Sequence, residues 1–488
     1  MLEYLTLRAR RTRERAVVRP DRGTGGLSKL GRPRRTAVAA VSAAALIALA
    51  GCASDSTGES NNTITYWLWD SGQQPGYQQC ADAFEQQNPD LKINIVQNGW
   101  NDYWSKLTAG FIADTAPDVF TDHLSKFAQY VDLDVLYSLD DLEATKDIAD
   151  DDYMPGLAEL WKGQDGKRYG APKDWDTIAW FYDQQAMDEA GITAEQLATA
   201  TWNPQDGGTF EQIIAHLTID ANGVRGDEPG FDKNDVEVYG LASNGSGGDG
   251  FGQTQWSPFT GSNDWQATNK NPWGNQFNFD DGNFQETMAW YYGLVDKGYM
   301  PDYNAIGGAN AIGPDKQLQT GMSASGFNGS WMISTYTTLQ TEDGNPIQVG
   351  LAPTPIGPSG QRASMFNGLA DSVTKQAKNP EAAAKWVKFL SGQECQNIIG
   401  SAGVVFPARP EGTDLAIAYN ADERGLDVSP FTEQVSQGTT FLFPVTSNAA
   451  DITALTKPTF DAIYIGDEPV SEFTQMNDQL NSLMQVAG

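Results

Sequence analysis

The 488-residue sequence contains few of the residues on which catalytic and metal sites usually depend. It has three cysteines, two histidines (His123 and His216) and no G-x-S-x-G motif. Two isolated histidines argue against a histidine-based zinc site and against Ser-His-Asp chemistry. We therefore expect no metal and no cofactor. Beyond residue 52 no run of about 18 apolar residues occurs, so this part is not a membrane protein.

Basic side chains are scarce beyond the first 51 residues. Those residues hold 11 of the 32 basic side chains and 3 of the 63 acidic ones, so the remainder carries 21 against 60, a formal net charge near −39. This balance argues against nucleic acid as a partner, because nucleic acid needs a basic surface, and against electrostatic docking on anionic lipid. Its ordinary meaning is solubility and self-repulsion.

The N-terminal region has the pattern of an export signal. A basic stretch precedes residues 37–50, which are apolar apart from Ser42 and shorter than the roughly 20 residues of a membrane-spanning helix. The ending Leu49-Ala50-Gly51-Cys52 resembles the bacterial lipobox, in which the cysteine receives a diacylglycerol and becomes the new N-terminus. We predict a signal peptide over 1–51, then a lipidated Cys52 and a flexible tether over 52–62. The alternative is an ordinary signal peptide with a chance cysteine.

Strand and helix patterns alternate from residue 63 onwards. Strand patterns occupy residues 63–69, 91–97 and 117–123, and helical patterns occupy 76–89, 102–114, 125–139, 285–298, 379–392 and 471–485. This alternation predicts βαβ units and a mostly parallel sheet, an α/β fold in which ligands bind at the carboxyl ends of the strands. Residues 240–283 are rich in loops. Gly245-x-Gly247-x-x-Gly250 follows no clear strand there, so we assign no nucleotide site to it.

Residues 220–235 have the oxygen-rich composition of a calcium loop. They depart from the EF-hand pattern, because Val224 occupies the third ligand position and the glycine is displaced. We expect a solvated acidic loop here, with a structural calcium site as the alternative.

Several segments occur in an order that is typical of one protein family. They are ITYWLWD (64–70), APDVF (116–120), DGKRYGAPKDWDTIAWFYDQQAMDEAGI (165–192), TWNPQDGGTFEQI (201–213), FNGSW (327–331), LAPTPIGPSG (351–360) and KNPEAAAKWVKFLSGQECQ (378–396). Together with the lipobox, this order resembles the extracellular solute-binding proteins of ABC importers, in particular the sugar-binding group that includes the maltose-binding protein.

The resemblance implies a two-lobed periplasmic-binding-protein-like fold with a ligand cleft between the lobes. It places lobe 1 at residues 63–173 and 372–412, and lobe 2 at residues 174–371 and 413–488. Cys80 and Cys395 lie on segments of helical pattern, and in an exported protein they can pair. We predict a disulfide between them, with two separately buried thiols as the alternative.

A sugar needs carboxylates, amides and basic groups for its hydroxyls, and an aromatic plane for its C–H groups. The resemblance puts a carboxylate of the lobe crossing at Asp176 and a stacking aromatic at Trp331. Where similar proteins carry a carboxylate and a cation in the turn after PDVF, this chain has Ser125 and Lys126, which leaves the sugar open. The predicted ligand-binding residues are Trp69, Asp70, Asp122, His123, Lys126, Trp175, Asp176, Trp331, Asn367 and Gly368; Trp256, Trp265 and Trp273 are candidates for the cleft mouth.

We interpret the chain as a monomeric, non-catalytic receptor, lipid-anchored on the outer face of the cell membrane. It would bind a mono- or oligosaccharide and deliver it to an ABC transporter permease. The alternative is a secreted glycoside hydrolase, because two catalytic carboxylates about 5 to 9.5 Å apart would leave no trace among so many acidic residues.

Overall fold

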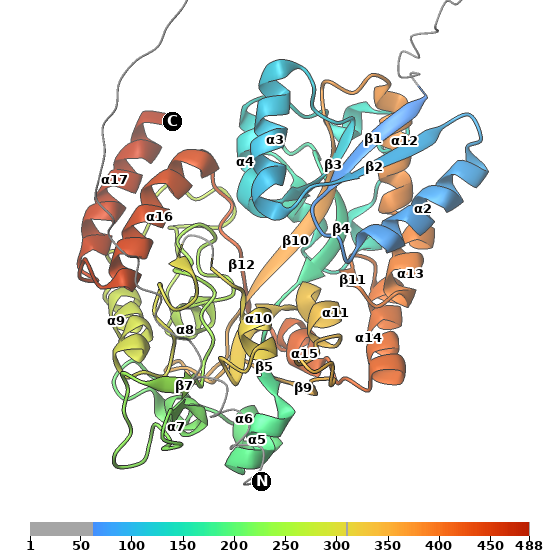
Figure 1. The fold of residues 1–488 in the computed structure, drawn as a ribbon. Helices are drawn as coiled ribbons and strands as arrows, with labels where there is room; N and C mark the ends of the chain where they lie inside the picture. Colours follow the sequence, from blue (N-terminus) through green and yellow to red (C-terminus); the bar gives the residue numbers. More distant parts are fainter. Residues whose placement is uncertain (1–61, 309–310, 488) are drawn as a thin grey trace, which may run out of the picture. The chain divides into compact units, whose positions relative to one another are not determined.

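The computed structural model describes residues 62–308 and 311–487 (Figure 1). The predicted signal peptide, the lipidation of Cys52 and the tether up to residue 61 lie outside these residues. None of the helices in the described part combines the length and the hydrophobicity that crossing a bilayer requires. Strands and helices alternate along the first third of this part, and the predicted α/β fold is confirmed.

The larger sheet contains seven strands. Its strands are β1 (Thr63–Leu68), β2 (Lys92–Gln97), β3 (Val119–His123), β4 (Ala171–Asp176), β10 (Ser364–Val373), β11 (Phe406–Pro407) and β12 (Thr440–Leu442). The order is β11-β4-β10-β3-β1-β2, and β12 pairs with β10. β1 is parallel to β2 and β3, whereas β10 runs antiparallel between β3 and β4. The sheet is therefore mixed, because a late segment inserts between two early strands.

Two layers of helices cover the two faces of this sheet (Figure 1). Tyr66 of β1 packs under α2 (Gln74–Gln87) and α12 (Pro380–Leu390), and Trp67, on the other face, packs near α3 (Trp100–Ala113). The period-two alternation of β1 produces this division, since neighbouring side chains of a strand point to opposite faces.

One predicted helix is too long. The helical pattern of residues 125–139 corresponds to α4 (Leu124–Asp132), which ends seven residues early. Asp134 adopts the left-handed conformation with φ of 55°, and Leu136 then pairs with Thr374 in a short β-bridge. A long-range backbone pairing thus replaces the local helical preference.

A second, three-stranded sheet follows directly after β4. It has the order β8-β5-β9, with β5 (Ile178–Asp183), β8 (Ser325–Gly329) and β9 (Val349–Ala352). Only Thr177 separates β4 from β5, so the chain passes from one sheet to the other within one residue. The predicted lobe boundaries after residues 173 and 371 fall inside β4 and β10, and both strands continue in the larger sheet on each side of them.

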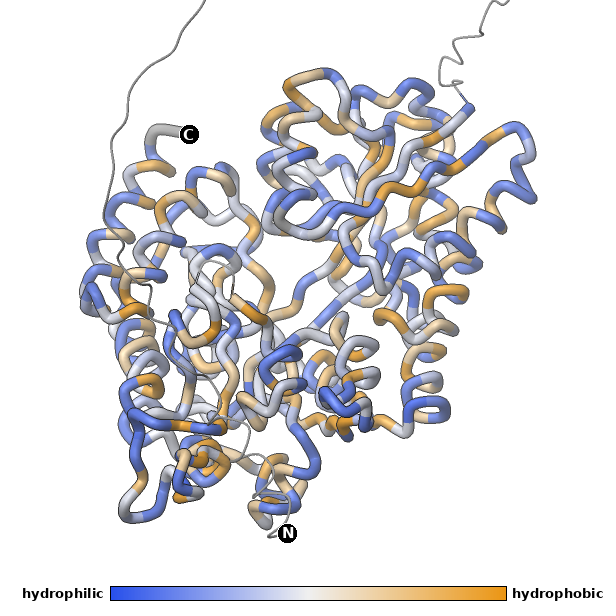
Figure 2. The backbone as a smooth tube through the Cα atoms, viewed as in Figure 1, coloured by the Kyte–Doolittle hydropathy of each residue, from blue (hydrophilic) through white to orange (hydrophobic). Residues whose placement is uncertain are grey.

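The remaining elements are mostly helices that pack around the two sheets. They are α5 (Gln184–Ala190), α6 (Ala194–Ala198), α7 (Gly208–Leu217), α8 (Ser257–Ser262), α9 (Gly282–Asp296), α10 (Pro314–Gln319), α11 (Ile333–Tyr336), α13 (Gln393–Ser401), α14 (Pro410–Arg424), α15 (Ser429–Gln437), α16 (Ala449–Ile465), α17 (Glu472–Ala487), the hairpin β6 (Ile219–Asp220) and β7 (Val236–Val238), and short 3₁₀ helices at Leu139–Asp141, Asp150–Asp152, Ala158–Trp161 and Ser330–Met332. Figure 2 shows hydrophilic residues gathered in many of the outer turns.

The two cysteines of the described part form a disulfide. Cys80 of α2 and Cys395 of α13 are joined, with their Cα atoms 5.2 Å apart, and both side chains are fully buried. The bond connects segments 315 residues apart in the sequence.

The acidic loop at 220–235 is organised by its own backbone. Asp220 accepts hydrogen bonds from the backbone N–H groups of Asp232, Val224 and Asn222, and these bonds lower its pKa. A carboxylate that is already surrounded by N–H donors is poorly placed to ligate a cation. Within residues 62–308 and 311–487, no group of three or more His, Cys, Asp or Glu side chains is arranged to hold a metal ion.

Candidate functional site

A chain of buried hydrogen bonds joins the ends of β3 and β4 to the middle of β10. The Nδ2 atom of Asn367 lies 2.9 Å from Nε2 of His123 and donates to Oδ2 of Asp176 at 3.2 Å. The pairing of β10 with β4 sets Asn367 opposite Asp176. Gln253, from the loop before α8, donates to Oδ1 of Asp176 at 2.8 Å. Three of the predicted residues therefore meet, together with Gln253, which the sequence did not single out.

Burial shifts the pKa values of the titratable groups in this hydrogen-bond network towards their uncharged forms. It lowers the pKa of His123 to about 3, helped by the nearby Lys126 ammonium, and raises the pKa of Asp176 well above its ordinary value. Burial also raises the pKa of the neighbouring Asp122 to about 8, although hydrogen bonds from His123 N–H and the Ser372 hydroxyl oppose the shift. These shifts favour the uncharged forms of the titratable groups in this hydrogen-bond network.

Three tryptophans surround His123 at the carboxyl edge of β1 and β3. Trp69 follows β1, and Trp100 and Trp104 lie on the first turns of α3. The ring centroids of Trp69, Trp100 and Trp104 are 5.1 to 5.4 Å apart, and those of Trp100 and His123 are 5.4 Å apart. Trp100 and Trp104 were missed in the sequence, although their position just after the second strand places them at the edge where ligands bind.

A second polar group, centred on Lys173, lies near the predicted residue Asp70. Nζ of Lys173 is 3.3 Å from Oε1 of Gln73 and 4.2 Å from the centre of the Tyr77 ring. Asp70 accepts a hydrogen bond from Nε2 of Gln73 at 3.0 Å, and it also accepts the backbone N–H of Gly72. Asp70 therefore holds the turn that leads into α2. Burial raises the pKa of Asp174 to about 7, while Lys173 acts to lower it.

Lys126 lies apart from both groups. It lines a small cavity with Asp249, Phe251 and residues of the 444–456 segment, which approaches the N-terminus of α4. Burial lowers the pKa of the ammonium, and Asp249 acts in the opposite direction. The cavity has a volume of only about 10 Å³, and its lining combines the Lys126 ammonium with apolar side chains such as Phe251 and Ile452.

Several buried polar atoms near these groups have no hydrogen-bond partner within the described residues. They are Oδ1 of Asn367, Oδ2 of Asp174, Nε1 of Trp104 and Oγ of Ser330. Ser330 adjoins the site, since its N–H donates to the carbonyl of Thr177, the residue after Asp176. Buried polar atoms are nearly always paired, so a concentration of unpaired donors and acceptors marks a place where a polar ligand can bind. Acceptors and donors together, beside aromatic rings, fit a neutral ligand with several hydroxyl groups.

Two predicted residues belong to the protein core instead. The Trp175 ring lies between Phe366 and Phe406, with centroids 6.0 and 4.9 Å away, and its Nε1 donates to Thr413. Both ring faces are thereby covered, which corrects the prediction that Trp175 contacts ligand. A Cβ added to Gly368 would lie 2.5 Å from Leu157, so Gly368 permits close packing.

Trp331 is half-buried and contacts two hydrophobic clusters. One contains Ile178 and Trp180 of the second sheet, and the other contains Tyr66 and Tyr77 beside the larger sheet. Its ring covers Gly329, where an added Cβ would be only 1.8 Å from the indole. The residue therefore sits where the two sheets meet, and its role towards ligand stays a prediction.

The three tryptophans expected at the cleft mouth differ in how deeply they are buried. Trp256 and Trp265 are core residues whose indole nitrogens donate to the carbonyls of Ser246 and Asn278. For these two the prediction is wrong, since both rings are buried. Trp273 is half-buried, and its ring centroid lies 6.3 Å from that of Phe127 on α4.

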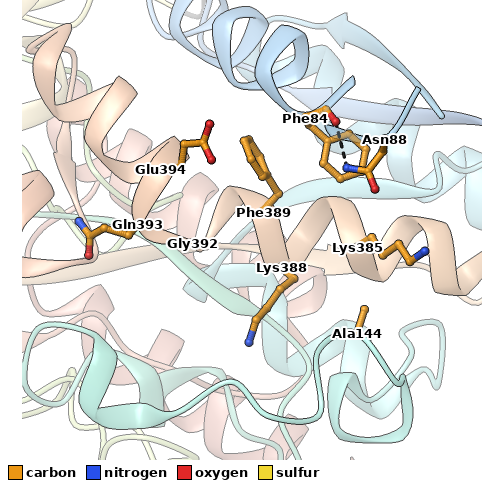
Figure 3. Close-up of a pocket in the computed structure, with 9 residues that line it drawn as sticks. All are labelled: Phe84, Asn88, Ala144, Lys385, Lys388, Phe389, Gly392, Gln393 and Glu394. Atoms are coloured by element: carbon orange, nitrogen blue, oxygen red, sulfur yellow. Dashed lines mark hydrogen bonds between the residues drawn. The ribbon is translucent and has the colours of Figure 1, made fainter. Parts of the chain in front are cut away.

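One cavity lies away from these residues (Figure 3). It has a volume of about 340 Å³ and is bounded by α2, α12 and the start of α13, with Phe84, Phe389 and Lys388 in its lining. Two of its charged groups already have partners, since Glu394 accepts from Gln87 and Lys388 pairs with Asp147. The network at Asp176, with its unpaired atoms, is the better candidate for a ligand site.

The chain belongs to the bacterial extracellular solute-binding protein family, whose model matches residues 79–424. A binding protein of Brucella abortus (strain 2308) is 22% identical over 437 residues, covering 87% of this chain and 92% of the relative. An ABC substrate-binding protein of Listeria monocytogenes, solved with cycloalternan, superposes with a TM-score of 0.71 at 22% identity, covering 87% of this chain and 99% of that one. The GacH receptor of Streptomyces glaucescens gives a TM-score of 0.66 at 19% identity, covering 87% and 98%. At these identities the structural similarity concerns the fold, and that fold is two-lobed.

Proposed function

We propose that the protein is a receptor that binds a neutral saccharide between its lobes and delivers it to an ABC transporter permease. The observation that carries this proposal is the set of unpaired buried donors and acceptors around Asn367 and Asp176, beside the rings of Trp69, Trp100 and Trp104. A hydroxyl group can donate a hydrogen bond to an unpaired acceptor and accept one from an unpaired donor. Indole faces cover the C–H groups of a sugar.

The chemistry of related proteins supports this choice of ligand. The Listeria protein was solved with cycloalternan, and GacH was solved with acarbose. In our chain burial shifts the pKa values of His123 and Asp176 towards their uncharged forms, which favours a neutral ligand as well, because uncharged groups offer no ion pair to a charged ligand.

Binding would be coupled to closure of the lobes. On the predicted lobe boundaries, the hydrogen bond at 2.9 Å from the backbone N–H of Ala450, at the start of α16, to the Gln129 side chain of α4 joins lobe 2 to lobe 1, and we assign it to the closed arrangement. Ligand that bridges the two lobes would raise the population of this arrangement, and the closed form would dock on the permease. The proposal includes a monomeric receptor without a cofactor, held on the outer face of the membrane by a diacylated Cys52.

The test is a thermal-shift screen of the purified protein against a panel of mono- and oligosaccharides. A ligand at 100 times its Kd stabilises the folded state by about 2.7 kcal/mol, which raises the melting temperature measurably. Absence of a shift with every saccharide would contradict the proposal. Analysing the sugars after incubation tests the absence of catalysis, since a receptor returns them intact and a glycoside hydrolase shortens them.

A further inference from the structure

Trp100 differs from the other aromatic residues of the described part in its exposure. The residue is 43% exposed. The other large hydrophobic residues that are exposed in this part are all aliphatic: Ile112, Leu133, Leu415 and Ile465. A large exposed indole loses favourable burial in water, so such a position is more often found where a ligand or partner covers the ring.

The ring is nevertheless held rigidly. It stands at 83° to the rings of Trp69 and Trp104, at centroid distances of 5.1 and 5.3 Å, and at 77° to His123 at 5.4 Å. Three neighbours therefore fix its orientation while a large part of its surface stays open. A ring that is already ordered loses little conformational entropy when a ligand stacks on it.

Unpaired polar atoms on the neighbouring residues also indicate a ligand. Nε1 of Trp104 and Nδ2 of Asn98 are buried donors without a partner among the described residues. Trp104 contacts Trp100 directly, and Asn98 precedes it by two positions. His123, which also contacts the Trp100 ring, is hydrogen-bonded to Asn367, and Asn367 in turn donates to Asp176. An apolar plane and hydrogen-bonding groups thus lie side by side, as the face and the edge of a sugar ring require.

We infer that Trp100, held by Trp69 and Trp104, is the aromatic platform on which one ring of a neutral saccharide stacks. This inference rests on the proposed function and adds a contact on the side of the larger sheet. The predicted aromatic Trp331 lies elsewhere, where the two sheets meet.

The experiment compares saccharide affinities of four proteins by isothermal titration. The probes are trisaccharides of α- and β-linked glucose, of mannose, of arabinose and of xylose, screened first on the wild type. With the trisaccharide that binds, Trp100→Ala should raise Kd by about 5- to 100-fold, and Trp100→Phe, which keeps an aromatic face, by a much smaller factor. The matched control is Ile112→Ala, on the exposed surface of the same helix, which should leave Kd within about twofold.

The outcomes separate this inference from the proposed function. If the wild type binds and Trp100→Ala binds within twofold of it, the platform is wrong and the receptor function stands. If the wild type binds none of the probes, both are overturned. Should Trp100→Ala fail to fold, Trp100→Leu replaces it, because leucine keeps apolar volume and removes the aromatic face. Weak binding by the Leu variant with near-normal binding by the Phe variant supports the platform, and equal binding by the two contradicts it.

Discussion

Replacing Asp122 by Asn should change how the stability of the protein depends on pH. Burial raises the pKa of Asp122 to about 8, whereas an aspartate in the unfolded chain has a pKa of about 3.9. Between these values the folded state holds one proton more than the unfolded state. The free energy of unfolding therefore falls by about 1.4 kcal/mol for each pH unit. This fall extends from about pH 4, the pKa in the unfolded chain, to about pH 8, the pKa in the folded protein.

The effect of Asp122 on the free energy of unfolding can be measured between pH 5 and pH 7. Over two pH units the contribution of Asp122 amounts to about 3 kcal/mol. Asparagine keeps an acceptor for the N–H of His123 but does not titrate, so Asp122→Asn should lose about 3 kcal/mol less stability over this range than the wild type. Urea denaturation of both proteins at both pH values gives the difference. Other buried acids, such as Asp174, titrate in both proteins and cancel.

The matched control is Asp102→Asn, because the Asp102 side chain is 76% exposed on α3. This variant should follow the pH dependence of the wild type. Equal losses of stability by the wild type and Asp122→Asn between pH 5 and pH 7 would refute the reasoning, because they would mean that Asp122 is ionised in the folded protein.

Trp331→Ala should weaken saccharide binding by roughly 1 to 3 kcal/mol while the protein stays folded, and unchanged affinity in a titration would remove its assigned role. Replacing both Cys80 and Cys395 by Ser should lower the free energy of unfolding by roughly 2 to 4 kcal/mol, and mass spectrometry that finds two free thiols in unreduced wild type would contradict the disulfide. Cys52→Ala should abolish labelling by a radioactive fatty acid in the expressing cells; a wild type that takes up no label would disprove the lipid anchor.

The fold class and the edge of the sheet that carries the candidate site could be predicted from the sequence. The alternation in TITYWL predicts a strand with one face buried, and the strand forms with Ile64, Tyr66 and Leu68 buried. Because the carboxyl ends of parallel strands meet at one edge, the residues after β1 and β3 could be named as candidates without coordinates. Asp176, His123 and Asn367 came from this reasoning and from the family resemblance, and they do meet.

Which side chains face one another depends on contacts between distant parts of the chain. The insertion of β10 between β3 and β4 requires pairing between segments about 190 residues apart for β4 and about 244 for β3, and local periodicity carries no information about such partners. Gln253 reaches Asp176 across 77 residues for the same reason. The sequence reasoning selected Trp175 and missed Trp100, yet Trp175 is enclosed by Phe366 and Phe406 while Trp100 stays exposed. Whether an aromatic ring stabilises the core or meets a ligand depends on what packs on its faces, and distant parts of the chain supply those neighbours.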